Sequence, residues 1–72
     1  MKYTVNIIDA SGRTICYTPD CTQRQAITVA CGDAATYPQP QYKVYISWYR
    51  KSDGQRGYLN PDGNHAITGS AW

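Results

Sequence analysis

The side chains best suited to molecular recognition in this sequence are tyrosines and lysines that alternate along one extended stretch. Every second position carries one of Lys43, Tyr45, Ser47, Tyr49 and Lys51. Alternate positions of a β-strand share one face, so these side chains would recur about every 7 Å along it. Exposed tyrosine rings anchor protein interfaces, and they also stack on bases or on sugar faces. The pattern therefore predicts a binding face rather than a catalytic one.

More aromatic and basic residues follow across a tight turn. The dipeptide Asp53-Gly54 favours a short hairpin loop, and the segment after it contains Arg56 and Tyr58. Phenylalanine is absent, so every aromatic ring carries a polar group and suits a half-hydrated position. We therefore expect the binding residues to be Tyr45, Tyr49, Arg50, Lys51, Arg56 and Tyr58. The alternative is an ordinary solvated face, on which side chains pair across strands and lysines protect an edge.

Residues for metal binding or covalent catalysis are few. The sequence has one histidine, His65, and no glutamate. Structural zinc sites use closely spaced cysteine pairs, and here only Cys16 and Cys21 come near that spacing, with no second pair after them. Aspartates in turns stabilise the backbone locally, and that setting holds for Asp9, Asp20, Asp53 and Asp62. We expect no enzyme, no metal site and no cofactor.

Three cysteines allow at most one internal disulfide, between two of Cys16, Cys21 and Cys31. The sequence leaves the pairing open, and the alternative is that all three are free thiols. The net charge of +2 and the many Tyr, Thr, Gly and Ser residues favour a secreted domain over a cytosolic one. No apolar run approaches the ~20 residues of a membrane-spanning helix, so we expect no membrane partner.

The composition favours β-structure. Ile, Val, Thr, Tyr and Trp fill 25 of the 72 positions, whereas Glu is absent and Leu occurs once. β-Branched and aromatic side chains suit a pleated, half-buried surface. Alternation predicts strands over residues 3–8, 13–17, 25–31, 42–51, 56–60 and 64–68.

Turn residues separate these strands. Residues 9–12, 52–55 and 60–63 combine Asp with Gly and are typical of tight turns. Residues 18–21 are either a plain loop or a short helical turn capped by Thr18. Residues 32–41 read as a loop, with an extended segment over 37–40 because residues before proline avoid the helical region.

Together these patterns predict one all-β domain over residues 1–72, with five to six short antiparallel strands in a meander that closes into a barrel or sandwich. A domain this small has a marginal core, because it buries only about 60% of the surface of its unfolded chain. The expected core consists of Val5, Ile7, Ile15, Ile27, Val29, Val44, Ile46, Trp48, Leu59 and Ile67.

The expected function is that of a non-enzymatic binding protein of the effector, toxin or inhibitor type. It would dock on another macromolecule, foremost a protein, through the Tyr/Lys/Arg-rich hairpin or by adding a strand to a partner's sheet. The alternative is a lectin-like carbohydrate-binding module, or a single-stranded nucleic-acid-binding module, that uses the same aromatic face. Dedicated duplex binders usually carry a strong basic stripe, which a charge of +2 does not indicate. Both a monomer and a dimer agree with the sequence, because an unpaired cysteine or an open strand edge could join two copies.

Overall fold

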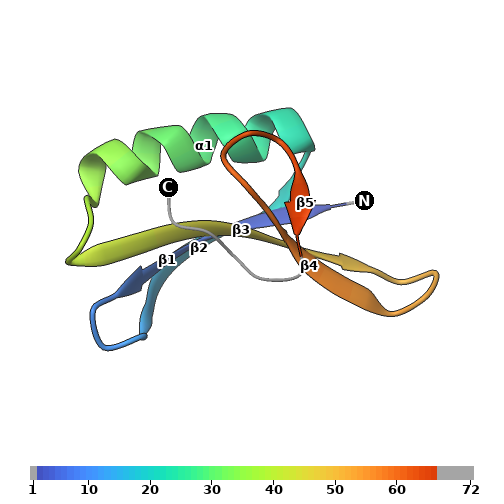
Figure 1. Cartoon of the computed structure of the whole chain (residues 1–72), viewed down its shortest axis with the longest axis horizontal. Coiled ribbons are helices and arrows are strands. Elements are labelled where there is room, and N and C mark those ends of the chain that lie inside the picture. The colour runs from blue at the N-terminus through green and yellow to red at the C-terminus, as the bar shows by residue number, and fades with distance from the viewer. Residues whose placement is uncertain (1, 67–72) are drawn as a thin grey trace.

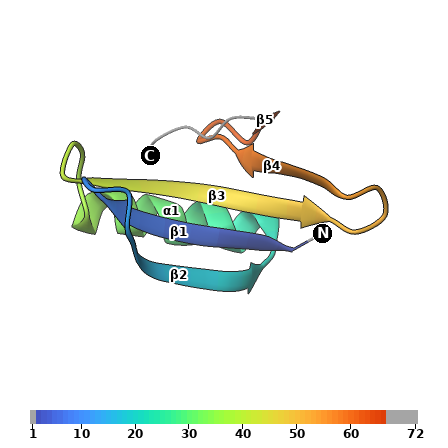
Figure 2. The ribbon, with the colours of Figure 1, turned by 90° about the horizontal axis from the view of Figure 1, so that it is seen from below.

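One helix packs on one face of an antiparallel sheet in the computed structural model, which describes residues 2–66 (Figure 1). The elements in chain order are β1 (Tyr3–Asp9), β2 (Thr14–Cys21), α1 (Gln23–Thr36), β3 (Tyr42–Arg50), β4 (Gln55–Leu59) and β5 (His65–Ala66). The strands lie in the order β2-β1-β3-β4-β5. Viewed from the side opposite α1, none of the described residues covers the sheet (Figure 2).

The alternation of side chains along β1 and β3 separates the two faces of the sheet. Tyr3, Val5 and Ile7 are buried, whereas the residues between them are half-buried. The register places Val5 opposite Ile46 and Ile7 opposite Val44, so the apolar sets of both strands lie on the face that packs against α1. This arrangement leaves the polar set of each strand on the opposite face.

The prediction of a domain built mainly of β-strands is confirmed, but the strand expected over residues 25–31 is wrong, because these residues lie within the 14-residue helix α1. The helix begins at a capping box: the Thr22 hydroxyl accepts a hydrogen bond from the Gln25 backbone N–H, and the Gln25 side chain accepts one from the Thr22 N–H. Both bonds satisfy donors that the first turn leaves unpaired. Ala26 and Ala30 are one turn apart and fully buried, so small side chains let the helix approach the sheet closely. This packing outweighs the modest strand preference of the β-branched residues between them.

The antiparallel sheet is confirmed, but it does not close into a barrel within residues 2–66. Four strands have five to nine residues, whereas β5 is a pair of residues. The described sheet thus has four full strands, and the expectation of five to six strands is slightly too high. The sequence reads residues 18–21 as a loop or helical turn, but they continue β2, with Asp20 in the left-handed region at φ 60°. The helix extends to Thr36, and the residues after it turn rather than extend, because the Tyr42 N–H donates to the Pro38 carbonyl.

The three turns that contain Asp and Gly are confirmed. Gly12, Gly54 and Gly63 all have positive φ, between 70° and 88°, which glycine adopts without steric strain. In the first turn, the Asp9 carboxylate accepts hydrogen bonds from the backbone N–H groups of Ser11 and Arg13. These turns set the registers of the hairpins β1–β2, β3–β4 and β4–β5.

The core contains half of the residues that the sequence assigns to it. The buried side chains are Tyr3, Val5, Ile7, Cys21, Ala26, Ala30, Val44, Ile46 and Leu59. The predicted core residues Ile27, Val29 and Trp48 are partly buried against this cluster, and Ile67 lies outside the described residues. Ile15 is a wrong prediction: it is 44% exposed, because it belongs to the edge strand β2 at an irregularity in the pairing with β1.

The three cysteines are free thiols, so the disulfide that the sequence allows between two of them is not formed. Cys16 on β2 and Cys31 on α1 are exposed, whereas Cys21 is buried at the end of β2. The Cys21 thiol makes weak hydrogen bonds to the carbonyls of Thr18 and Pro19. It therefore contributes to the core as a small apolar side chain.

Candidate binding face

The sheet face opposite α1 gathers most of the residues that the sequence analysis selected for binding. We call it the open face; its side chains are Lys2, Thr4, Asn6, Lys43, Tyr45, Ser47, Tyr49, Lys51, Arg56 and Tyr58, with Asp20 at its border. Asp20 belongs to β2, and the other residues come from β1, β3 and β4 or lie just beyond the ends of these strands. The strand period places them on one side, because each strand buries its alternate residues against the helix or the core.

Strand pairing determines which side chains are neighbours on the open face. β1 and β3 place Asn6 opposite Tyr45 and Thr4 opposite Ser47. β3 and β4 place Ser47 opposite Tyr58. Ser47 therefore lies at the centre of the face, with a polar residue on β1 and a tyrosine on β4.

The tyrosine rings are held by contacts within the face. Tyr45 and Tyr58 meet edge to face, with ring centroids 5.7 Å apart and an interplanar angle of 63°. The Arg56 guanidinium lies 5.6 Å from the centroid of the Tyr49 ring, within the range of a cation–π contact. Tyr49 is still 49% exposed, so much of its ring remains available to a ligand.

The Tyr45 hydroxyl remains protonated at neutral pH. Partial burial, with a smaller contribution from the neighbouring Tyr58, raises the pKa of Tyr45 above its ordinary value of 10.0. Both causes disfavour the phenolate, because it would be poorly solvated and close to a second ionisable phenol. Tyr45 can therefore act as a hydrogen-bond donor as well as an aromatic surface.

Hydroxyl and amide groups lie between the rings. The Asn6 side-chain amide donates to the Ser47 hydroxyl and to the Thr4 carbonyl, each at 3.0 Å. Ser47 accepts this bond, which leaves its own O–H able to donate to a ligand. The centre of the face is therefore polar and orients its hydroxyl groups.

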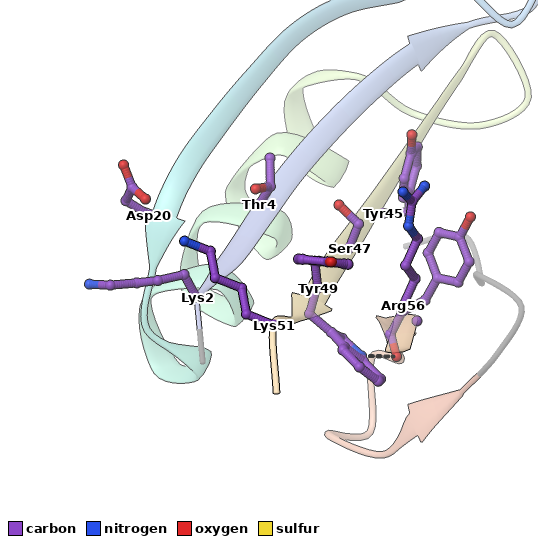
Figure 3. A pocket seen from close by; sticks show the side chains of 11 residues that line it. Lys2, Thr4, Asp20, Tyr45, Ser47, Tyr49, Lys51 and Arg56 are labelled. Carbon is purple, nitrogen blue, oxygen red and sulfur yellow. Dashed lines mark hydrogen bonds between the residues drawn. The ribbon is translucent and has the colours of Figure 1, made fainter. Parts of the chain in front are cut away.

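The face is hollowed at this polar centre (Figure 3). Lys2 and Lys51 lie on one side of the hollow, and Tyr45 and Arg56 lie on the other. Ser47 is placed between these two sides. A ligand seated there would meet two lysines on one flank, and a tyrosine ring and a guanidinium on the other.

Positive charge is concentrated on the open face. Its cations are Lys2, Lys43, Lys51 and Arg56, and its only carboxylate among the described residues is Asp20. The protein as a whole has a net charge of only +2, so the face is more positive than the rest of the molecule. The mild total charge conceals this asymmetry.

Two other aspartates stabilise turns. The Ser11 hydroxyl, followed by the Arg13 N–H, holds the pKa of Asp9 below its ordinary value. At the β3–β4 turn, the Gln55 N–H and then the Arg50 side chain lower the pKa of Asp53. Both carboxylates are thus anions that serve local structure.

The structure brings together five of the six residues that the sequence selected: Tyr45, Tyr49, Lys51, Arg56 and Tyr58. Arg50 is separate from them. Its guanidinium forms an ion pair with Asp53 at 3.0 Å and lies 5.8 Å from the Trp48 ring. Trp48 packs against the core cluster beneath α1, so Arg50 belongs to the opposite side of the hairpin.

Sequence reasoning missed the contribution of β1 to this face. Lys2, Thr4 and Asn6 line or border the hollow, but they are about 40 positions from Tyr45 in the chain. Their alternation with Tyr3 and Val5 is a signal for a polar strand face. It does not reveal that β1 pairs with β3. Tyr17 on β2, opposite Asn6 in the register and 64% exposed, was missed in the same way.

The histidine lies on the other side of the sheet. His65 Nε2 is 2.8 Å from the Tyr3 hydroxyl, and its ring meets the Trp48 ring edge to face. Within residues 2–66, no group of three or more His, Cys, Asp or Glu side chains is arranged to hold a metal ion. The one described helix is too short and too polar to cross a membrane.

Comparisons of the chain with protein-family models, with curated proteins and with solved structures gave no match.

Proposed function

We propose that this protein is a non-enzymatic binding protein that docks on another macromolecule through the open face of its sheet. The observation that carries the proposal is the hollow between Lys2 and Lys51 on one flank and Tyr45 and Arg56 on the other, on a face that no described residue covers. A sheet face with no such role would carry scattered polar residues. This one carries rings and cations around a depression.

The rings suit this role because their positions are largely fixed before a ligand arrives. Tyr45 rests against Tyr58, and Tyr49 lies under the Arg56 guanidinium. A tyrosine has few rotatable bonds, and its neighbours already restrict them, so little conformational entropy is lost on binding. Tyrosine and arginine at the centre of an interface are also the residue types that most often dominate binding energy.

The same geometry favours binding over catalysis. His65 is hydrogen-bonded to Tyr3 on the other side of the sheet, so it does not serve as a base for the Ser47 or Thr4 hydroxyl. The phenol of Tyr45 has a raised pKa, which makes it a poorer base or nucleophile at neutral pH. These groups are arranged to donate hydrogen bonds and to stack.

A panel of ligand classes tests the proposal. The immobilised protein is offered a displayed random-peptide library, a glycan array and a pool of random single-stranded oligonucleotides. Tyr49→Ala and Arg56→Ala alter the open face, and Arg24→Ala removes an exposed cation from α1 as the matched control. Circular dichroism establishes that each variant folds.

The expected result is retention of at least one ligand class by the parent protein and by Arg24→Ala. Each open-face variant should weaken that retention roughly tenfold or more, since central tyrosines and arginines contribute about 2 kcal/mol when they are hot spots. The proposal fails if the open-face variants retain ligands as well as the parent does, or if the folded parent retains none of the three classes.

A further inference from the structure

From the chemistry of the open face we infer that the partner is a single-stranded nucleic acid. The inference rests on the proposed function and narrows it to one class of macromolecule. It depends on three features that occur together: a surplus of positive charge, exposed rings and hydroxyl donors between them. Each feature matches one part of a nucleotide.

The charge matches a chain of phosphates. Lys2 and Lys51 flank the hollow on one side and Arg56 flanks it on the other, with Lys43 farther along β3. Asp20 is the single carboxylate at the border. A neutral sugar offers no negative charge to attract these four cations, so this arrangement argues against a neutral glycan.

The rings match unstacked bases. Tyr49 is half exposed, and the edge-to-face contact with Tyr58 fixes the Tyr45 ring. Tyr45 and Tyr49 are four positions apart on β3, so their Cα atoms are about 13 Å apart along the strand. Bases of a single strand can turn outward and stack on such rings. Duplex bases are paired and stacked on one another, so they do not present their faces to these rings.

Hydrogen-bonding groups lie where a base edge or a sugar would rest. The Ser47 hydroxyl accepts from Asn6 and keeps its own proton to donate. The protonated Tyr45 hydroxyl is a second donor. Ser47 lies between the lysine flank and the flank of Tyr45 and Arg56, and the Tyr45 hydroxyl belongs to the second flank (Figure 3).

The residue types favour nucleic acid over a protein partner. Lysine and serine are depleted in the buried centres of protein interfaces, whereas tyrosine and arginine are enriched there. Here Ser47 occupies the centre of the hollow, and two lysines flank it. Desolvating these lysines against a mostly apolar protein surface would be unfavourable, whereas phosphate oxygens replace their water shell with charge-assisted hydrogen bonds.

Fluorescence anisotropy with defined oligonucleotides tests the inference. The probes are fluorescein-labelled oligo-dT and oligo-rA of about 12 nucleotides, which is within the site sizes of single-strand-binding folds, and a hairpin duplex of similar length. A labelled oligoglutamate peptide serves as an anionic probe without bases. Titrations run from about 50 to about 200 mM salt, because phosphate contacts release counterions.

The single strands should bind more tightly than the duplex and the peptide. If all four cations contact phosphates, affinity should fall roughly 50-fold over that salt range, at a slope of about −0.7 per contact. Lys51→Gln should reduce this fall to roughly 20-fold. Tyr49→Ala should weaken binding roughly 5- to 150-fold, as expected for the loss of one stacked base. The helix variant Arg24→Ala should bind like the parent.

Different failures separate the inference from the proposed function. If neither oligonucleotide binds but a peptide or glycan is retained through Tyr49 and Arg56, the nucleic-acid inference is wrong and the binding function stands. If the duplex or the oligoglutamate binds as tightly as the single strands, base stacking is refuted. If single strands bind the parent, Tyr49→Ala and Lys51→Gln equally well, the open face is not the binding site. The nucleic-acid inference and the proposed function then both fail.

Discussion

Replacing Ile46 by alanine should destabilise this protein far more than the same change at Ile15, although both isoleucines lie in strands. Ile46 is fully buried at the middle of β3, opposite Val5 on one side and Leu59 on the other. The substitution removes three carbons, each contributing about 0.8 kcal/mol by transfer from water. A cavity term adds to this, so the expected loss is roughly 3–4 kcal/mol.

Ile15 has the same side chain in a different setting. It is 44% exposed on the edge strand β2, so its truncation removes about half as much buried apolar surface and leaves no enclosed cavity. The expected loss is therefore about 1 kcal/mol. The difference between the two variants should be at least about 2 kcal/mol.

Urea denaturation measures this difference. A chain of this size has an expected stability of roughly 4–11 kcal/mol and a urea m-value of about 1 kcal/mol per molar. Ile46→Ala should thus lower the unfolding midpoint by roughly 3 M, and Ile15→Ala by about 1 M. Far-UV circular dichroism and the fluorescence of the half-buried Trp48 follow the transition.

If Ile46→Ala does not fold, Ile46→Val replaces it in the comparison, because this smaller truncation should lower the free energy of unfolding by only about 1 kcal/mol. Ile15→Val should lower the free energy of unfolding by less. Equal losses at Ile15 and Ile46 would refute the reasoning. Equal losses would mean that Ile15 on β2 is as buried as a residue of a central strand. The core would then extend beyond the side of the sheet that faces α1.

Three further outcomes follow from local contacts. Thr22→Ala removes the cap of α1 and should lower the free energy of unfolding by about 1 kcal/mol, measured by urea denaturation; an unchanged midpoint would argue against the capping box. Alkylation followed by mass spectrometry should add two groups to the native protein and a third only in denaturant, because Cys21 is buried while the other two thiols are exposed. Partial burial, and to a lesser degree Tyr58, raises the pKa of Tyr45 above 10.0. In an ultraviolet titration, part of the tyrosinate absorbance should therefore appear only at a pH above that of ordinary tyrosines. Because folding raises this pKa, the contribution of Tyr45 to the free energy of unfolding is fully present below pH 10. It is lost as the pH rises through the pKa of the folded state. Tyr45→Phe should remove part of the late signal, and a titration unchanged by that substitution would contradict this account.

Much of the sheet could be predicted from the sequence because its signals are local. The alternation in β1 and β3, and the turns at Gly12, Gly54 and Gly63, depend on neighbouring residues alone. The helix was missed because Ile27 and Val29, at every second position, imitate a strand. The Thr-x-x-Gln capping box that begins the helix is visible in the sequence, but it is a shorter signal than the β-branched run.

The candidate site was predicted only where one strand or one hairpin supplies it. Spacing along β3 placed Tyr45 and Tyr49 correctly on one face, and the turn brought Arg56 beside them. The same two-residue period puts Arg50 with Trp48 instead, which the structure shows. Lys2 and the polar residues of β1 that follow it join the face only through long-range pairing, which depends on how the whole chain packs.

The position of β1 between β2 and β3 links the order of synthesis to the risk of misassembly. β1 pairs with β2 at once, but its other edge waits for β3, whose Trp48 lies opposite Tyr3. A chain still emerging from the ribosome would therefore present a free backbone edge on β1 until residue 50 is outside the exit tunnel. Such an edge recruits strands from other chains, and pairings this distant in sequence form slowly. Chains stalled before β3 should aggregate, whereas chains released after β4 should fold.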